Sequence, residues 1–228
     1  MSLFFFSALA CPTPEAPPPE KTAAAPPKAA ARSGDPYPFA TCPVSGKKLG
    51  EMGSPVTRLY EGREVRFCCD ACPATFEKQI DASLRAVDDK IAADQGSLYP
   101  TANSIVTGKT LPAKPIEFVF GNRLIRVSDE TERKIFESDP SKYLALLNKA
   151  VIEAQSPGYP LLSCPVSDEK FGGEMGEAVN VVVAGRLIRI CCDSCADSVE
   201  AAPAKYLLLL DTARAAKKAP AGAEEGAR

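Results

Sequence analysis

The chain has 228 residues and a formal charge of −2, with 27 basic residues against 29 acidic ones. This balance leaves no basic excess to hold a phosphate backbone, so we expect no nucleic-acid partner. Histidine is absent, which removes the commonest general base and the commonest metal ligand. Any metal site must therefore use sulfur or oxygen, and the nine cysteines are the first candidates.

The first segment has features of an export signal. Residues 1–10, MSLFFFSALA, form a short apolar run that ends in small residues directly before Cys11. Cys11 stands where a bacterial lipoprotein signal places its lipidated cysteine, although Ala8 replaces the preferred leucine. The run is too short to span a bilayer, which needs roughly 20 apolar residues. We expect a lipid anchor on Cys11 that holds the protein on the periplasmic or extracellular side of a bacterial membrane. The alternative is a disordered apolar N-terminus.

Two further segments have a composition that cannot bury a core. Residues 11–36 are rich in Pro and Ala and show no apolar periodicity, so we expect a disordered tether there. Residues 213–228 are polar and Ala-rich, and we expect a disordered tail.

The intervening chain contains three copies of one pattern, which we place at residues 37–96, 97–156 and 157–212. A Tyr-Pro pair stands at or within two residues of the start of each copy, and the tyrosines are Tyr37, Tyr99 and Tyr159. The pairs are followed by CPVSGKKLG, SIVTGKTLP and CPVSDEKFG, respectively. A pattern that recurs at a nearly fixed spacing indicates one structural unit used three times.

Each copy continues with two β-prone runs around a two-residue turn. The runs are VTRLY-EG-REVRF, IEFVF-GN-RLIRV and VNVVV-AG-RLIRI, and a glycine in such a turn is typical of a β-hairpin. A helical pattern follows, and in the first copy its apolar face contains Phe76, Ile80, Leu84, Val87 and Ile91. We expect prolines to break this helix in the other two copies, at Pro140 and Pro203. The expected fold class is α+β, with three tandem small modules that each contain a cysteine knuckle, a β-hairpin and an α-helix.

Eight of the nine cysteines fall in the first and third copies. They are Cys42, Cys68, Cys69 and Cys72 in the first, and Cys164, Cys191, Cys192 and Cys195 in the third. Modules this small bury little apolar surface, and thiolate coordination can supply most of their folding free energy. We therefore predict two bound ions, one in each set, and thiolate ligands favour Zn(II) or Cu(I).

The adjacent cysteines raise a geometric question, because neighbouring side chains on a strand point to opposite faces. Both can approach one ion only if the strands end before them, so we predict strand ends at Phe67 and Ile190. Three ligands are then the safer count, with Cys68 or Cys69 as the weaker one. The C-x-x-C pairs lie at a predicted helix start, where the helix dipole lowers the pKa of a thiol.

The middle copy lacks this cysteine set. Its corresponding positions hold Ser104, Ser128, Asp129 and Glu132, so we expect no soft metal there. Asp129 and Glu132 are three residues apart at a predicted helix start, as in a capping box. Hydrogen bonds are expected to stabilise this copy.

The pattern CPVSG followed by Y-x-G-x-x-V-x-F-C-C-x-x-C-x-x-x-F resembles the small YHS and TRASH heavy-metal-binding modules. The likeness extends to FESDPSKYL in the second copy and PAKYL in the third. It implies a hairpin-and-helix fold around a cysteine site, with a role in metal sensing, trafficking or resistance and a donor or acceptor protein as partner. The family often has a cysteine before the knuckle glycine, whereas Ser45 and Ser167 stand there in this sequence.

Three alternatives remain open at this point. An exported protein meets an oxidising compartment, where the cysteines could form disulfides such as Cys42 to Cys72. A purely structural zinc in an interaction domain is the second alternative. Thiol–disulfide catalysis by C-x-x-C is the third, but nothing in the sequence resembles the βαβ scaffold of such enzymes. We therefore expect a binding protein and not an enzyme.

Overall fold

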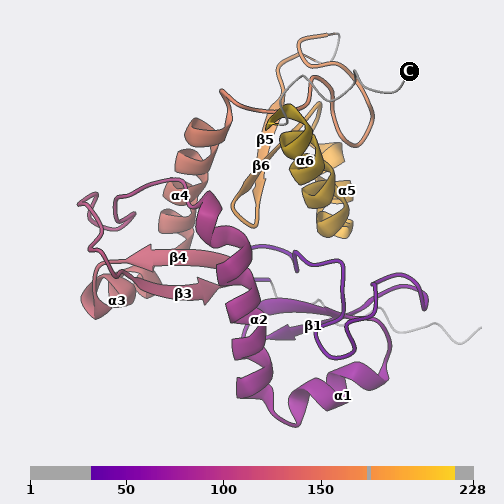
Figure 1. The fold of residues 1–228 in the computed structure, drawn as a ribbon, viewed down its shortest axis with the longest axis vertical. Helices are drawn as coiled ribbons and strands as arrows, with labels where there is room; N and C mark the ends of the chain where they lie inside the picture. Colours follow the sequence, from indigo (N-terminus) through magenta and orange to yellow (C-terminus); the bar gives the residue numbers. More distant parts are fainter. Residues whose placement is uncertain (1–31, 174–175, 219–228) are drawn as a thin grey trace, which may run out of the picture.

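The computed structural model describes residues 32–173 and 176–218. Within them the chain is α+β, with three two-stranded antiparallel sheets and six α-helices. A hairpin followed by two helices occurs three times along the sequence (Figure 1).

The strands are β1 (Val56–Tyr60), β2 (Arg63–Phe67), β3 (Ile116–Phe120), β4 (Arg123–Val127), β5 (Val179–Val183) and β6 (Arg186–Ile190). The helices are α1 (Ala71–Glu77), α2 (Ile80–Gln95), the short 3-10 helix η1 (Gly96–Leu98), α3 (Glu130–Ser138), α4 (Pro140–Gln155), α5 (Ser194–Ala201) and α6 (Pro203–Lys218).

The three predicted hairpins are confirmed, and they share one register. In the first, Val56 lies opposite Phe67 and Tyr60 opposite Arg63, and the other two hairpins pair in the same way. Both turn residues have positive φ in each hairpin, as at Gly121 (51°) and Asn122 (64°). Such turns match the right-handed twist of the flanking strands. The predicted strand ends at Phe67 and Ile190 are also confirmed.

A knuckle precedes each hairpin and has the same geometry in all three copies. An isolated β-bridge closes it, between Thr41 and Lys48 in the first copy. Equivalent bridges join Asn103 to Thr110 and Ser163 to Lys170. Cys42 directly follows the first bridged residue, Thr41, and Ser104 and Cys164 hold the equivalent positions in the other copies. The bridge therefore holds each of these residues at a fixed place beside its hairpin.

The helical part differs from the prediction, because it is broken in the first copy as well. Gln79 separates α1 from α2 with φ −138° and ψ 56°. Asp139 and Ala202 adopt nearly the same conformation between the helices of the other copies. A following proline disfavours the helical conformation at Asp139 and Ala202, but Ile80 follows Gln79. The break therefore belongs to the repeat and does not depend on proline.

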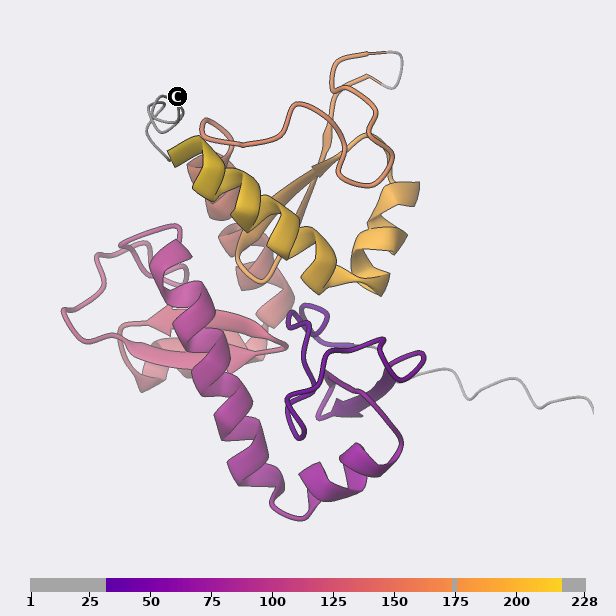
Figure 2. The same ribbon diagram turned by 45° about the vertical axis from the view of Figure 1, so that its right-hand side comes forward.

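The long helices connect successive copies. Helix α2 packs against β3 and β4 of the second copy, and α4 packs against β5 and β6 of the third (Figures 1 and 2). The Gln95 side chain accepts a hydrogen bond from the Leu124 amide at 2.9 Å, and Gln155 does the same for the Leu187 amide at 2.9 Å. Leu124 is buried in the core of the first copy. Each copy thus has an apolar core of its own, and the second copy contributes Leu124 to the core of the first and Val151 to that of the third. The module boundaries given above stay a prediction.

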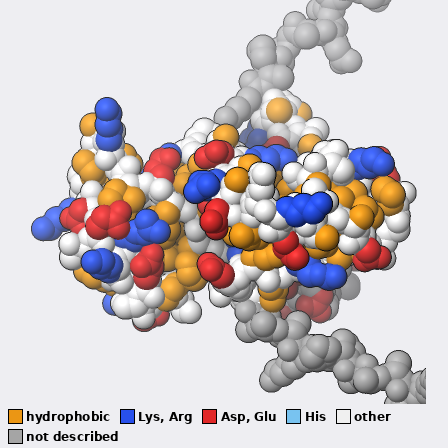
Figure 3. All heavy atoms as spheres, turned by 90° about the horizontal axis from the view of Figure 1, so that it is seen from below, with side chains coloured by type: hydrophobic (Ala, Val, Ile, Leu, Met, Phe, Trp, Pro, Cys, Tyr) orange, Lys and Arg blue, Asp and Glu red, His pale blue; other side chains and the backbone are white. Residues whose placement is uncertain are grey.

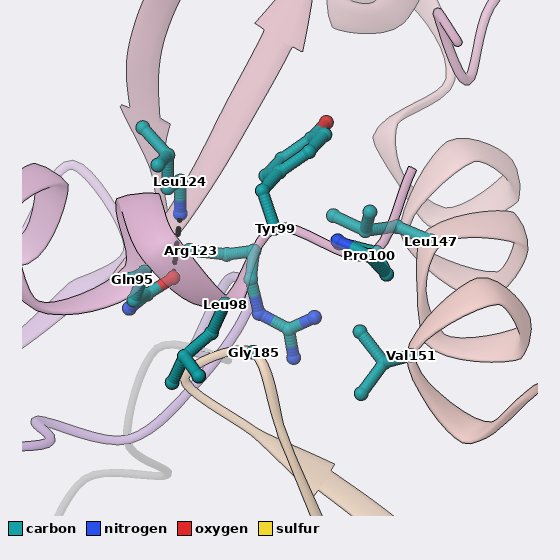
Figure 4. Close-up of a pocket in the computed structure, with 9 residues that line it drawn as sticks. All are labelled: Gln95, Leu98, Tyr99, Pro100, Arg123, Leu124, Leu147, Val151 and Gly185. Atoms are coloured by element: carbon teal, nitrogen blue, oxygen red, sulfur yellow. Dashed lines mark hydrogen bonds between the residues drawn. The ribbon is translucent and has the colours of Figure 1, made fainter. Parts of the chain in front are cut away.

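A buried ion pair lies where the three hairpin turns meet. Arg123 donates from Nε to Asp35 Oδ2 at 2.7 Å and from Nη2 to Oδ1 at 3.0 Å. The Ala184 amide, in the third turn, donates to the same carboxylate at 2.6 Å. Figure 4 shows the adjoining cavity, where Arg123 lies between Gln95 of α2 and Gly185 of the third turn. Its volume is about 10 Å³, room for about one water molecule.

The structure describes residues in both segments that we expected to be disordered. The tether was expected to reach residue 36, yet Asp35 belongs to the buried junction. The tail was expected from residue 213, yet α6 continues to Lys218. In this Ala-rich stretch the half-buried Arg214 donates from Nη2 to Gln155 Oε1 at 2.6 Å.

Residues 1–10 and Cys11 lie outside the described residues. In the part that is described, none of the helices combines the length and apolarity that crossing a membrane requires. On the face drawn in Figure 3, basic and acidic side chains are interspersed with hydrophobic ones.

Candidate metal centre

The first cysteine set comes from three successive elements. Cys42 lies in the knuckle, Cys68 directly follows β2, and Cys72 lies in the first turn of α1. Their Sγ atoms all lie within 4.8 Å of one another, and Cys68 and Cys72 are 3.7 Å apart. The three residues are only 2, 3 and 7% exposed. The fold therefore brings three buried sulfurs together without any change of backbone.

The third copy repeats this arrangement with Cys164, Cys191 and Cys195. The Cys195 sulfur is 3.9 Å from that of Cys164 and 3.7 Å from that of Cys191. All three residues are buried. The predicted meeting of each knuckle thiol with the thiols at its own helix start is thus confirmed in both copies.

The fourth cysteine of each set lies at the edge of its triad. Cys69 is partly exposed, and its sulfur is 3.5 Å from Cys72 and 4.0 Å from Cys68. Cys192 is also partly exposed and lies 3.7 Å from both Cys191 and Cys195. Neither belongs to the group of mutually close sulfurs. Of the two adjacent cysteines, the outlying one is therefore Cys69 and not Cys68.

These spacings fit a thiolate-bound metal ion. Four sulfurs that each lie 2.3 Å from a tetrahedral zinc are about 3.8 Å from one another. The sulfur–sulfur distances among Cys68, Cys69 and Cys72, between 3.5 and 4.0 Å, bracket that value. The knuckle sulfur of Cys42 lies within 4.8 Å of those of Cys68 and Cys72. The donor set contains only sulfur, which suits Zn(II) and Cu(I) and disfavours Mg(II) and Ca(II).

A hydroxyl group contacts each cysteine set, a role that we did not predict. Ser45 Oγ is 3.2 Å from Cys68 Sγ, and Ser167 Oγ is 3.2 Å from Cys191 Sγ. Thr107 occupies the corresponding place in the middle copy. The signal for this role was present in the repeat, because a hydroxyl residue stands at this position in all three copies.

The two knuckle cysteines have lowered pKa values. Burial by itself raises the pKa of Cys42, but hydrogen bonds from the Ser45 hydroxyl and from nearby backbone N–H groups outweigh it and lower the pKa to about 6. Burial also raises the pKa of Cys164, but hydrogen bonds from the Ser167 hydroxyl and from nearby backbone N–H groups outweigh it and lower the pKa to about 7. The knuckle therefore favours a thiolate, the form that binds metal.

The cysteines at the helix starts do not behave uniformly. Backbone N–H groups lower the pKa of Cys69, as expected at a helix start. For Cys72, however, burial and the neighbouring thiols raise the pKa to about 12. Cys195 is raised to about 12 for the same reasons. The expectation that the helix dipole lowers these thiol pKa values is wrong for Cys72 and Cys195, because burial outweighs it.

The middle copy closes the same junction with a carboxylate. Glu132 accepts hydrogen bonds at 2.7 Å from the Ser104 hydroxyl, the Thr107 hydroxyl and the Ser128 amide. Asp129 caps α3 by accepting from the amides of Thr131 and Glu132. The capping role of Asp129 is as predicted, but Glu132 reaches the amide of Ser128, one residue before the cap. A full capping box would reach the amide of the cap residue itself.

The structure therefore places eight of the nine predicted site residues, and Cys11 lies outside the described residues. All eight cysteines in the two sets are free thiols in the part of the chain that is described. The chain matches no family model, no curated protein and no solved structure.

Proposed function

We propose that this protein binds one soft metal ion, Zn(II) or Cu(I), in each of its two cysteine sets and exchanges it with other molecules. The observation that carries the proposal is the meeting of three buried sulfurs within 4.8 Å in both cysteine-containing copies. Free thiols gain little from such crowding, whereas a metal ion requires it. The proposal is of a binding protein and not of an enzyme.

Two features support the proposal that the protein exchanges its metal ions with other molecules and does not only hold them. The fourth cysteine of each set is partly exposed, so an incoming ligand can replace it without unpacking the buried triad. The middle copy adopts the same fold with hydrogen bonds in place of cysteines. The fold is therefore compatible with a state that holds no metal, as a delivery site requires.

A structural metal site is the second candidate, and the burial of the triads favours it. Residues such as Cys42 and Cys164 are at most 2% exposed, and a closed four-sulfur site is typical of structural zinc. The two candidates differ in what happens when the metal is removed. A structural site unfolds its copy, while an exchange site leaves the fold in place.

The wider setting is also part of the proposal. The cysteine pattern that resembles YHS and TRASH modules supports a role in metal trafficking, sensing or resistance, with a metal donor or acceptor protein as partner. The apolar run before Cys11 supports a lipid anchor that holds the protein at the outer side of a bacterial membrane. We propose that the chain is organised as three tandem modules, of which the first and the third bind metal.

Metal analysis of reduced protein tests the central claim. We expect two ions per chain after loading and desalting, and one ion in the Cys72→Ser variant. Cys69→Ser is the matched comparison, and it should retain two ions with weaker binding. A stoichiometry near zero in reduced, metal-supplied wild-type protein would exclude the proposal.

A second experiment distinguishes exchange from structural binding. Circular dichroism and hydrogen exchange of the chelator-treated protein report whether the first and third copies remain folded. Transfer of the ion to an added chelator while α1 and α5 stay protected supports exchange. Loss of protection in these copies on metal removal would establish the structural alternative.

A further inference from the structure

The loop between the knuckle and the hairpin carries a second sequence signature that follows the cysteines. In the first copy this loop contains Gly-Glu-Met-Gly at residues 50–53, and the third copy repeats the tetrapeptide at 173–176. The chain has three methionines, and apart from Met1 both of the others, Met52 and Met175, stand in this tetrapeptide. Methionine in this protein therefore occurs, beyond the first residue, only in the copies that have cysteines.

The middle copy provides the contrast. Its shorter loop reads Pro-Ala-Lys-Pro at residues 112–115, with neither glycine nor methionine. The knuckle, the hairpin and the helices are the same in all three copies, so the fold does not require the methionine. Its presence instead correlates with the thiol sites.

The surroundings of Met52 also argue against a packing role. The residue is 56% exposed and lies between Gly50 and Gly53, both with positive φ. No atom lies near the place where either glycine would carry a Cβ. An apolar side chain held on an open glycine loop contributes little hydrophobic stabilisation, because most of its surface stays in water.

A short series of contacts connects this thioether to the first cysteine set. Met52 Sδ is 4.0 Å from Lys47 Nζ. The amide of Lys47 donates to Ser45 Oγ at 3.3 Å, and that oxygen is 3.2 Å from Cys68 Sγ. The exposed thioether and the buried Cys68 thiol thus both contact the same knuckle, the first at Lys47 and the second at Ser45.

We propose that Met52 is a capture ligand for Cu(I), which its thioether binds at the surface before the ion passes to Cys42, Cys68 and Cys72. This inference rests on the proposed metal-binding function and specifies the metal. Thioethers are soft ligands that suit Cu(I), whereas zinc in proteins is bound by Cys, His, Asp and Glu. The ion remains Cu(I) throughout, the thioether gives up no proton, and each ligating cysteine that is still protonated releases its proton to solvent.

The test measures the rate of metal loading at the first site alone. A Cys164→Ser/Cys195→Ser background in the full chain removes the triad of the third copy. Reduced protein is mixed with a coloured Cu(I)–chelator complex, and the loss of colour is followed by stopped flow. We expect Met52→Leu to slow Cu(I) loading on the order of tenfold, the size of effect typical when a group that assists a metal site is lost. Zn(II) loading should be unchanged.

The matched control is Ile135→Leu, which alters an exposed apolar residue of the cysteine-free copy and should leave both rates unchanged. Equal slowing of Cu(I) and Zn(II) by Met52→Leu would indicate a structural effect and overturn the inference. Unchanged Cu(I) loading in this variant would overturn it as well. If the wild-type chain binds neither ion, the proposed function itself fails, so the two failures are distinguishable.

Discussion

Glu132 accepts a hydrogen bond from the Ser104 hydroxyl at 2.7 Å and so joins the knuckle of the middle copy to its first helix, α3. Cys72 and Cys42 hold the corresponding places in the first copy, where their sulfurs lie within 4.8 Å of each other. One backbone arrangement is therefore closed by hydrogen bonds in one copy and lined by thiols in two others. Because the positions correspond, a metal site can be tested by introducing cysteines into the middle copy as well as by substituting them in the first and third copies.

The first prediction is that a third site can be built. The variant Ser104→Cys/Ser128→Cys/Glu132→Cys places thiols at the positions of the first triad while Asp129 continues to cap α3. We expect the bound metal to rise from two ions to three, as measured by elemental analysis. Glu132→Cys alone supplies one thiol and should leave the count at two. A count of two in the folded triple variant would show that the backbone arrangement does not suffice for binding.

The second prediction concerns the carboxylate of the middle copy. Glu132→Gln replaces one of the two carboxylate oxygens, which accept from Ser104 and Thr107 respectively, with an NH₂ group that cannot accept a hydrogen bond, and it removes the negative charge that strengthens the remaining bonds. We expect the free energy of unfolding to fall by about 1–3 kcal/mol, the cost of leaving buried polar groups unsatisfied. Urea denaturation of the metal-free protein measures it. The exposed Glu130→Gln is the control and should change the value by less than about 0.5 kcal/mol.

The same variant has a defined pH dependence. Burial opposes ionisation of Glu132, but the three hydrogen bonds outweigh it and hold the pKa below the usual 4.5. A lowered pKa contributes stability that is present above the unfolded value and is lost as the pH falls through the folded value. The difference between wild type and Glu132→Gln should therefore shrink on acidification below about pH 4.5. A difference that grows there would contradict this account.

The third prediction is a change in the pH dependence of metal affinity at the first site. At neutral pH the pKa of about 6 leaves Cys42 ionised, while the pKa of about 12 leaves Cys72 protonated. Metal binding then displaces the proton of Cys72 but none from Cys42. Below about pH 6 the proton on Cys42 must be displaced as well. The affinity for metal should consequently fall as the pH is lowered from neutral, and it should fall more steeply below about pH 6.

Chelator competition at a series of pH values measures this slope. Ser45→Ala removes the hydroxyl that lowers the pKa of Cys42, so the steeper region should begin at a higher pH in that variant. A break at the same pH in both proteins would mean that another group causes it.

The fourth prediction concerns the junction of the three hairpin turns. Asp35→Ala leaves the Arg123 guanidinium, 2% exposed as a side chain, without its carboxylate partner. Removing one member of a buried ion pair typically costs about 3–5 kcal/mol, so thermal or urea unfolding should show a large loss of stability. Glu153→Ala, which breaks an exposed pair with Lys149, should cost at most about 1 kcal/mol. A small effect of Asp35→Ala would show that the junction does not hold the copies together.

The sequence by itself determined the local elements and the composition of the site. Alternating β-prone runs around EG, GN and AG specified three hairpins, because their signal lies within a dozen adjacent residues. The strand ends at Phe67 and Ile190 followed from the requirement that adjacent cysteines reach one point. The residue differences among the three copies distinguish two thiol sites from one hydrogen-bonded site without reference to the tertiary structure.

Only the tertiary structure decided how these elements combine. It identified Cys69 as the outlying sulfur, because the direction of the chain after β2 depends on how α1 packs. It showed that burial raises the pKa of Cys72 against the helix dipole, and burial is a property of the whole fold. It also placed Asp35, within the predicted tether, on Arg123. That contact joins residues far apart in the chain, and no local periodicity encodes the partner of a side chain at such a separation.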